Sequence, residues 1–327
     1  MPDLLDRLHT SAPLWSAGMG GGLAGPALTA AVSEAGGFGV LGCGGGLPRA
    51  EVSRLIAQTR ALTSRAFGAN VILPMSDGSD IEACFDARVP VLVLFWGDVQ
   101  PFVADAHRRD MYVVAQCGGP DDAVAAADAG VDAVIVQGSE AGGHVKARAP
   151  LAETVPAAVR VLGPVPTIAA GGIATGADIA DALALGARGV SLGTRFLACS
   201  EAAAHDDYKA RVVAAAAADT LLTELFDIGW PAAAHRVLRN AVVSAWEAAG
   251  RPAPGARPGE GEEIGTIGRG ESQVVVPRYS VLPPVTDFDG DLEAVALYAG
   301  ESVDRIDAVA DAATIMTNLM EELRAAT

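Results

Sequence analysis

The sequence predicts an α/β fold: a (β/α)8 TIM barrel with a mostly helical capping domain inserted before the last helix. Short apolar runs alternate with amphipathic, Ala-rich stretches through the first two-thirds of the 327 residues. Eight such runs occur without a break, each nearly continuous in apolar residues, as expected for parallel strands buried on both faces. Together they occupy about 205 residues, near the ~250 of a typical barrel. A doubly wound open sheet is the structural alternative.

The elements follow in order along the chain. Predicted strands lie at residues 14–17, 38–41, 67–72, 91–95, 111–115, 133–137, 166–170 and 189–192. Predicted helices between them include residues 26–35, 49–62, 121–129, 151–162 and 178–185. Several strands begin just after a helix stop made of Ala and Gly, as at Ala129-Gly130. This alternation is what the barrel prediction requires.

The rhythm changes beyond the eighth strand. Residues 201–250 are predicted to be largely helical, including 214–218 and 236–248. A Pro- and Gly-rich stretch at 251–261 predicts an exposed, irregular connector, and residues 273–283 can pair as short strands. Apolar spacing predicts one helix over 302–324. We therefore expect a barrel from residues 1–205 plus 296–327 and a capping, substrate-binding domain from 206–295.

Composition excludes several function classes. The net charge is −17, so the chain has no basic footprint for nucleic acid or for an anionic membrane surface.

Four cysteines form no CxxC pair and have no metal-like His spacing, which favours free thiols in a reducing cytoplasm and no metal site. The first residues lack a basic region followed by an apolar run, so we expect no signal peptide. The uncharged run at 8–33 contains two prolines and five glycines, and we interpret it as strand, loop and helix instead of a membrane span.

A GxGxxG match stands at residues 20–25, after a strand and before a helix. A dinucleotide site also needs an acidic residue at the end of the second strand, about 20 residues on. That strand ends in Val-Leu-Gly-Cys-Gly, with no carboxylate. A Rossmann dehydrogenase is therefore disfavoured. The absence of GxxxxGK[ST] disfavours a P-loop NTPase.

Two other glycine motifs close the seventh and eighth strands, AAGGI at 169–173 and SLGTR at 191–195. In barrels these two loops commonly bind phosphate, because glycine lets backbone N–H groups approach the anion. Thr175 and Asp178 form a capping-box pattern for the helix that follows. Tight turns are the alternative explanation, but the positions of both loops favour a phosphorylated ligand. Backbone donors also let an acidic protein bind such a ligand.

The loop after the sixth strand, QGSEAGGHVK at 137–146, places His144 at the same end of the barrel. Histidine suits general acid–base chemistry near neutral pH. His107, His205 and His235 fall in predicted helices and are interpreted as surface or packing residues.

Further polar residues end strands at the same face of the barrel. Asn70 and Gln116 can hydrogen-bond the edge of a heteroaromatic ring or cap a turn. Arg195 can face a phosphate or an internal carboxylate. Cys43 has no visible base and is interpreted as structural.

The chain resembles the nitronate monooxygenase family in these motifs and in three more: AGGFGVLG at 35–42, AHDDYK at 204–209 and LYAGESV at 297–303. The combination of QGxEAGGH with a GGI and a GT pair is specific, and the resemblance runs over nearly the whole chain. It implies an FMN-dependent barrel with a cap and no metal. The implied reaction is oxidation of an alkyl nitronate with O2 to a carbonyl compound and nitrite, in which the flavin carries the redox step.

The resemblance also assigns roles to residues. His144 matches the catalytic base or substrate hydrogen-bond donor, and Lys146 helps to hold the anionic substrate. Gly172, Gly193 and Thr194 hold the phosphate. The full implied cofactor-binding set is Asn70, Gln116, Gln137, Gly142, Gly143, Gly171, Gly172, Ser191, Leu192, Gly193 and Thr194. The run Val145-Lys146-Ala147-Arg148 departs from many relatives, which leaves the substrate open.

Three functional hypotheses remain beside the Rossmann one. The first is a flavoprotein monooxygenase of nitronate monooxygenase type. The second is an NAD(P)H-dependent FMN reductase of a quinone or an enoyl thioester, since fold and flavin site are shared across this superfamily. The third is a catalytically silent flavin or phosphate binder. In each case we expect a cytoplasmic protein with a small-molecule ligand, and the sequence leaves open whether it forms a homo-oligomer.

Overall fold

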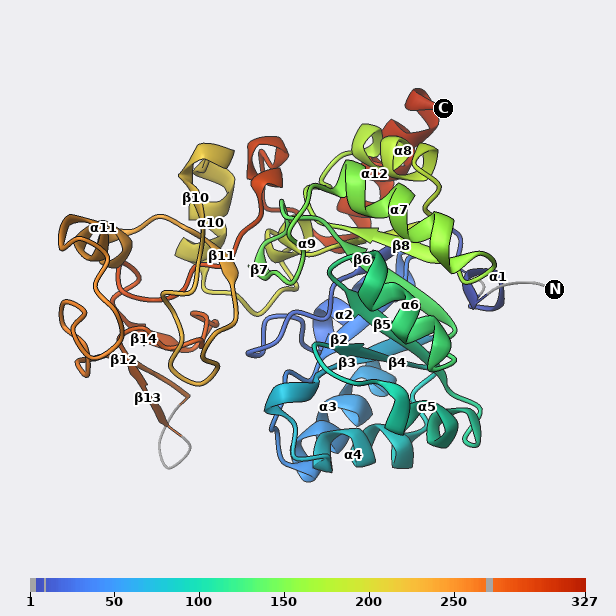
Figure 1. Ribbon diagram of the computed structural model, residues 1–327, viewed down its shortest axis with the longest axis horizontal. Coiled ribbons are helices and arrows are strands. Elements are labelled where there is room, and N and C mark those ends of the chain that lie inside the picture. Colours follow the sequence, from blue (N-terminus) through green and yellow to red (C-terminus); the bar gives the residue numbers. More distant parts are fainter. Residues whose placement is uncertain (1–3, 9, 269–272) are drawn as a thin grey trace.

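Eight parallel strands form a barrel in the computed structural model, which describes residues 4–8, 10–268 and 273–327 (Figure 1). The strands are β1 (Leu14–Ser16), β2 (Gly39–Gly42), β3 (Phe67–Ile72), β4 (Val91–Phe95), β5 (Tyr112–Cys117), β6 (Ala133–Gln137), β8 (Thr167–Ala170) and β9 (Gly189–Leu192). Their order in the sheet is β1-β9-β8-β6-β5-β4-β3-β2. The N–H of Phe38 donates to the carbonyl of Leu14 at 2.8 Å, and that of Ser16 donates to the carbonyl of Phe38 at 3.0 Å. These bonds join β1 to the start of β2, so the predicted barrel is confirmed.

Helices surround the barrel, one after most strands. They are α2 (Pro26–Glu34), α3 (Arg49–Leu62), α4 (Ser79–Ala87), α5 (Gln100–His107), α6 (Pro120–Asp128), α7 (Leu151–Leu162) and α8 (Gly176–Ala184). Strands β3, β4, β6 and β9 and helices α3 and α7 coincide with their predicted bounds. An apolar cluster that includes Trp15, Phe38 and Ile135 fills the barrel, and a larger one lies between the strands and the helices. The short helix α1 (Leu4–Arg7) contributes Leu4 to the interior cluster.

The terminal helix is shorter than predicted. Residues 302–324 contain a 3-10 turn, η4 (Glu301–Arg305), and then helix α12 (Ala312–Ala326). The side chain of Asp311 caps α12 by accepting a hydrogen bond from the N–H of Thr314 at 2.7 Å, which fixes the helix start there. The helix after β9, α9 (Thr194–Leu197), has only 4 residues, and α12 packs beside α8 (Figure 1). The end of the chain therefore completes the helical layer.

Residues 206–295, which we call the cap, hold fewer helices than predicted. Helices α10 (Asp206–Ala214) and α11 (Ala241–Ala248) and the 3-10 turn η2 (Ala217–Asp219) are joined by five strands. The strands are β10 (Thr220–Thr223), β11 (His235–Leu238), β12 (Glu263–Ile267), β13 (Val274–Pro277) and β14 (Phe288–Gly290).

The helix predicted over 236–248 needs the main correction. Its first residues are β11, because they pair with β10, and α11 begins only after its N-cap Asn240. The predicted helix at 214–218 is the end of α10 and the start of η2. Of residues 273–283, predicted to pair as short strands, only β13 is a strand, and it pairs with β12. The connector at 251–261 is irregular, as predicted.

One barrel loop joins the cap. Residues Gly143–His144 form the short strand β7, which pairs with β11 so that the cap sheet runs β10-β11-β7 (Figure 1). The sheet β13-β12-β14 lies in the lower part of the cap in this view. Among the described residues we find no helix with the length and hydropathy of a membrane span. The pairing of β7 with β11 decides where His144 lies.

Candidate active site

A cavity of about 760 Å³ lies at the carboxyl ends of the barrel strands, against the cap. Loops after β1 and β2 form one side, and cap residues that include Trp230, Val281 and Pro283 form another. Apolar side chains dominate the walls, with a few amides and hydroxyls between them. Ligand sites in barrels occupy this face, and the volume suits a small-molecule ligand.

Most of the predicted site residues meet in this cavity. Its lining includes His144 from β7. The lining also includes Asn70, Gln116, Gln137, Gly142, Gly143, Gly171, Gly172, Ser191, Gly193 and Thr194. These residues lie at the carboxyl ends of β3, β5, β6, β8 and β9 or in the loops that follow them. The closed barrel brings them together because the carboxyl ends of parallel strands share one face.

Leu192 and Lys146 are placed elsewhere. The side chain of Leu192 packs in the cluster between strands and helices, since neighbouring strand residues point to opposite faces. The Nζ atom of Lys146 lies 2.9 Å from a carboxylate oxygen of Asp122 on α6. Arg195 is buried, and its guanidinium donates to the carbonyl of Ala308 at 2.8 Å. None of the three lines the cavity.

Two contacts hold His144 in place. Its ring stacks on that of Trp230, with centroids 4.1 Å apart and planes 24° apart. The side chain of Gln137 clamps the backbone around it: Nε2 donates to the carbonyl of His144 and Oε1 accepts from the N–H of Lys146, both at 3.0 Å. The amide of Gln137 thus fixes the loop that carries His144.

The imidazole of His144 is neutral at pH 7. Burial, with a smaller contribution from the neighbouring His235, lowers the pKa of His144 to about 3. Its Nε2 atom is buried and has no hydrogen-bond partner within the described part of the chain. A buried polar atom without a partner is rare in folded proteins. The structure therefore presents a neutral histidine with unused hydrogen-bonding capacity beside the cavity.

His235 is the main correction at the site. It was expected on a helix, but it lies on β11, fully buried, with its ring centroid 5.2 Å from that of His144. Its Nδ1 lies 2.9 Å from the carbonyl of Ala233, and its Nε2 accepts from the N–H of Phe226 at 3.1 Å. Since a carbonyl only accepts, the proton is on Nδ1. Burial lowers the pKa of His235 to about 4.

His107 lies on α5 and His205 caps α10, in keeping with surface or packing roles. His9 lies outside the described residues.

Aromatic residues complete the surroundings of His144, and no role was predicted for them from the sequence. Besides Trp230, the ring of Tyr298 lies 5.5 Å from that of His144, and its hydroxyl donates to the carbonyl of Val281 at 2.9 Å. Burial raises the pKa of Tyr298 above its ordinary value. The LYAGESV motif marked the segment of Tyr298, whereas no local pattern marks Trp230.

The two glycine loops offer backbone donors. Gly171 and Gly172 have φ of +109° and +70°, which favours glycine at both positions. Within the described part of the chain, the N–H groups of Gly172, Gly193 and Thr194 have no acceptor. The capping box of Thr175 and Asp178 is present as predicted. These donors can hold a phosphate group.

The chemistry of the cavity walls suits a ligand that joins a phosphate to a flat ring system. Free N–H groups serve the phosphate, and the amides of Asn70 and Gln116 can hydrogen-bond the polar edge of a ring system. The apolar walls suit its flat faces. The described residues contain no cluster of His, Cys, Asp or Glu that could hold a metal ion.

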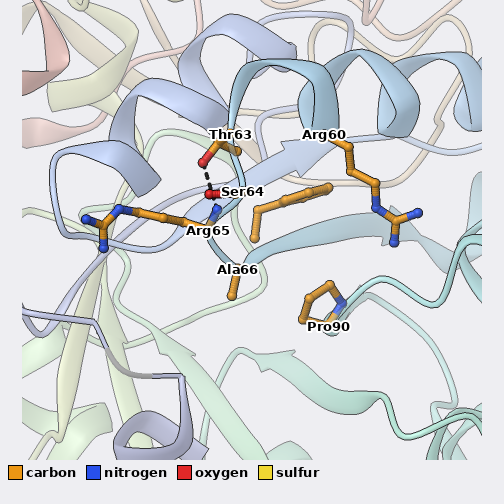
Figure 2. A pocket seen from close by; sticks show the side chains of 7 residues that line it. Arg60, Thr63, Ser64, Arg65, Ala66 and Pro90 are labelled. Atoms are coloured by element: carbon orange, nitrogen blue, oxygen red, sulfur yellow. Dashed lines mark hydrogen bonds between the residues drawn. The ribbon is translucent and has the colours of Figure 1, made fainter.

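A second hollow lies at the amino ends of β3 and β4, at the opposite end of the barrel (Figure 2). Arg60, Thr63, Ser64, Arg65, Ala66 and Pro90 line it, and the hydroxyl of Thr63 accepts from the N–H of Arg65 at 3.0 Å. Loops that vary for function occupy the other face of a barrel, so this hollow does not compete as the active site.

Comparisons with known proteins agree with this geometry. The family model described as nitronate monooxygenase matches residues 2–91 and 80–322. A nitronate monooxygenase of Paraburkholderia phytofirmans is 33% identical over 267 residues, covering 67% of this chain and 72% of the relative. A (3aS,4S,5R,7aS)-5-hydroxy-7a-methyl-1-oxo-octahydro-1H-indene-4-carboxyl-CoA dehydrogenase of Rhodococcus jostii is 35% identical over 250 residues, covering 76% of this chain and 68% of the relative. Among solved structures, FabK from Thermotoga maritima has a TM-score of 0.79 at 27% identity, covering 99% of this chain and 97% of that chain.

Proposed function

The chain belongs to the nitronate monooxygenase family, and from that premise we propose that it is an FMN-dependent oxidoreductase that oxidises alkyl nitronates with O2 to a carbonyl compound and nitrite. The observation that carries the proposal is His144, a neutral histidine that lines a cavity with a phosphate-type glycine site and whose buried Nε2 has no hydrogen-bond partner among the described residues. The cavity thus combines a place for a flavin with a group that can contact substrate.

The residues of this chain would bind the cofactor, and FMN supplies the redox chemistry when it is bound. Gly172, Gly193 and Thr194 would hold its phosphate through their backbone N–H groups. Asn70 and Gln116 would hydrogen-bond its ring system. The hydroxyl of Thr194 accepts from the N–H of Gly300 at 3.0 Å, so the phosphate loop is tied to the segment that carries Tyr298.

His144 would act chiefly as a hydrogen-bond donor to the nitronate. A pKa of about 3 makes it a weak base in the free protein. A bound anion favours the protonated imidazole, so a nitronate next to the ring raises the pKa of His144 and strengthens the contact. Trp230 covers one ring face and limits access of water. Lys146 pairs with Asp122 outside the cavity lining, so we assign it no contact with substrate.

One observation favours a second candidate function. The relative with 35% identity is named as a dehydrogenase of a CoA thioester. The cavity also reaches Arg54 and Leu55 on α3, which leaves room for a substrate larger than a small nitronate. An NAD(P)H-dependent FMN reductase of an enoyl thioester or a quinone is therefore the alternative.

An anaerobic titration of the flavin-loaded protein with propyl-2-nitronate tests the proposal. We expect the oxidised-flavin absorption band to bleach and to recover when air is admitted, with nitrite formed. His144→Ala should retain flavin and slow bleaching by at least about 100-fold, because a positioned polar group contributes roughly that much. His107→Gln on α5, outside the cavity lining, is the matched control and should react as wild type. If the oxidised-flavin absorption does not change with the nitronate but bleaches with NAD(P)H, the proposal is wrong and the alternative function is favoured.

A further inference from the structure

A buried cation, Arg236, lies on β11 directly after His235. In the antiparallel pairing of β11 with β7, the backbone of His235 lies opposite that of His144, and the backbone of Arg236 lies opposite that of Gly143. Neighbouring strand residues point to opposite faces, so the side chain of Arg236 leaves the strand on the face away from the two histidines. It therefore reaches a different part of the loop that carries His144.

The guanidinium of Arg236 contacts three segments of the chain. Its Nη1 donates to the hydroxyl of Thr220 on β10 at 3.1 Å, and its Nη2 donates to the carbonyl of Ser139 at 2.8 Å. The same Nη2 lies 2.9 Å from a carboxylate oxygen of Glu301, at the start of η4. Ser139 belongs to the loop between β6 and β7. One side chain thus joins the cap sheet to two segments at the mouth of the barrel.

These two segments also bond to each other and to the phosphate loop. The N–H of Glu301 donates to the carbonyl of Glu140 at 2.9 Å. The neighbouring N–H of Gly300 donates to the hydroxyl of Thr194 at 3.0 Å. Arg236 therefore lies where the loop that carries His144 meets the segment bonded to the phosphate loop.

Fold stability alone does not account for a cation at this position. The side chain of Arg236 is 11% exposed against 40% for its partner Glu301, and its buried Nε has no hydrogen-bond partner among the described residues. A buried polar atom without a partner is costly. Replacing a buried ion pair by apolar side chains is often neutral or stabilising. The contacts of Arg236 thus favour a role in fixing geometry.

We propose that Arg236 is a positioning residue that sets where His144 lies relative to the phosphate loop. This inference rests on the proposed function for what His144 does, and on the contacts of Arg236 for where His144 lies. Arg236 holds the carbonyl of Ser139, while Gln137 holds the backbone around His144, so the loop is fixed at two points. Without the guanidinium, the loop keeps only the clamp of Gln137 and the pairing of β7 with β11.

The reactivity of His144 toward diethyl pyrocarbonate tests this positioning without turnover. The reagent acylates accessible neutral imidazoles. Mass spectrometry of the peptide that contains His144 measures the rate in the flavin-loaded protein, with the half-exposed His107 as the reference in the same sample. In Arg236→Met we expect acylation of His144 to be at least about fivefold faster than in wild type, because losing hydrogen bonds from a charged donor makes opening of the loop easier.

Two further variants control the acylation experiment. Arg236→Lys keeps a cationic donor but cannot hold three partners, so we expect at least about a twofold increase, less than in Arg236→Met. It takes the place of Arg236→Met if that variant does not fold. Arg239→Met is the matched control, since Arg239 pairs with Glu247 in a more exposed ion pair, and it should react as wild type. Equal acylation of His144 in wild type and in the folded Arg236 variants would overturn the proposal.

The limiting rate of flavin bleaching separates positioning from stability. At saturating propyl-2-nitronate, Arg236→Met should retain FMN and bleach at least about tenfold more slowly than wild type, because a misplacement of about 1 Å can cost that much or more. KM should change less than this rate, and Arg236→Lys should recover part of it. A variant that loses thermal stability but bleaches at the wild-type rate would show that Arg236 serves the fold alone.

The two experiments distinguish this inference from the proposed function. If wild type oxidises no nitronate but acylation of His144 still depends on Arg236, the proposed reaction fails and the positioning stands. If nitronates are oxidised but neither acylation nor bleaching responds to Arg236, the reaction stands and the positioning fails.

Discussion

At the scale of single residues, two adjacent histidines that are both neutral lie at the candidate site. His144 lines the cavity, and its buried Nε2 has no partner in the part of the chain that the structure describes; both ring nitrogens of His235 contact the backbone. Their spacing on paired strands, β7 and β11, explains why neither gains a proton: each is buried, and a charge on one would oppose a charge on the other. The histidine that we propose to contact substrate thus packs beside one whose ring nitrogens are both occupied.

The titration of these histidines predicts how stability depends on pH. The pKa of His235 is about 4 in the folded protein against an ordinary 6.5, so below pH 6.5 the unfolded chain binds a proton that the folded chain does not. Its contribution is complete above about pH 6.5 and is lost as the pH falls toward 4. Between pH 7.5 and 5, this loss amounts to about 2 kcal/mol for each such histidine.

Urea unfolding at several pH values checks this prediction. His235→Leu should be less stable at neutral pH, because Phe226 loses its acceptor, yet its stability should fall with acid by about 2 kcal/mol less than that of wild type. Val237→Ala, on the same strand, removes buried apolar volume without a titrating group and should keep the wild-type pH dependence. Identical slopes for wild type and His235→Leu would show that His235 titrates normally in the fold.

At the scale of elements, the short strand β7 joins the barrel to the cap and depends on close backbone packing beside it. A Cβ atom added at Gly142 would lie 2.3 Å from the backbone nitrogen of Gly300 and 2.5 Å from the carbonyl carbon of Ala299. Both obstacles are backbone, so no side-chain rotation relieves the clash. Gly142 therefore lets the loop before His144 lie against the segment that follows Tyr298.

Gly142→Ala should disrupt this junction. We expect a loss of at least about 3 kcal/mol of stability and weakened flavin retention, because overpacking against backbone moves both the phosphate loop and His144. Thermal unfolding and the flavin-to-protein absorbance ratio measure the two effects. Gly119→Ala is the matched control, since nothing lies within 4 Å of its added Cβ and its φ of 174° suits any residue. Equal behaviour of the two variants would mean that the junction is not tightly packed.

The irregular connector at 251–261 contains Arg257, whose buried side chain forms ion pairs with two carboxylates. Arg257 has a side chain that is only 3% exposed, and it pairs with Asp227 and Glu260 while its guanidinium lies 4.3 Å over the ring of Tyr279. It also donates to the carbonyl of Leu225 at 2.9 Å. A segment without helix or strand is thus anchored to the loop that carries Trp230.

Arg257→Met should lower the free energy of unfolding by about 2–4 kcal/mol, because it leaves two carboxylates and a carbonyl without a buried partner. It should also raise KM for nitronate, since Asp227 supports Trp230. Denaturant unfolding and steady-state kinetics measure both. Arg49→Met, whose partner Asp86 is more than half exposed, is the control and should leave the unfolding midpoint unchanged. If Arg257→Met is destabilised but its KM for nitronate is unchanged, Arg257 stabilises the fold without positioning Trp230.

At the scale of the whole molecule, the site relies on local donors within an acidic protein. The net charge of −17 repels an anionic nitronate at long range, whereas His144 and the backbone N–H groups act only at contact. The field of the molecule therefore opposes the approach of its proposed substrate and favours neutral ones.

Salt should relieve this repulsion. Raising ionic strength from about 10 to 200 mM should increase kcat/KM for propyl-2-nitronate by about two- to fivefold, because the screening length shortens. Binding of the uncharged nitrobutane should stay constant over the same range. A fall of kcat/KM with salt would mean that a local cation attracts the nitronate, and Arg54 at the rim of the cavity would be the first residue to replace.

The sequence by itself determined the barrel and predicted where the candidate site lies. Eight apolar runs in βα rhythm predicted the strands, since local propensity and burial on both faces agree there. Motifs at the ends of strands predicted His144, the amides and the glycine loops, because parallel strands in a barrel end on one face whatever the details of packing.

The tertiary structure alone decided what surrounds His144. Residues 235–238 are a strand because β10, about fifteen residues earlier, and β7, about ninety residues earlier, both pair with them, and no local pattern encodes the pairing with β7. The same pairing brings His235 and Trp230 to His144, and it leaves Lys146 to Asp122 and Leu192 to the core. Long-range pairing and the direction of each side chain are properties of the assembled fold. Long-range pairing and side-chain direction set the charge and the shape of the pocket, whereas the sequence predicted only its position at the carboxyl ends of the strands.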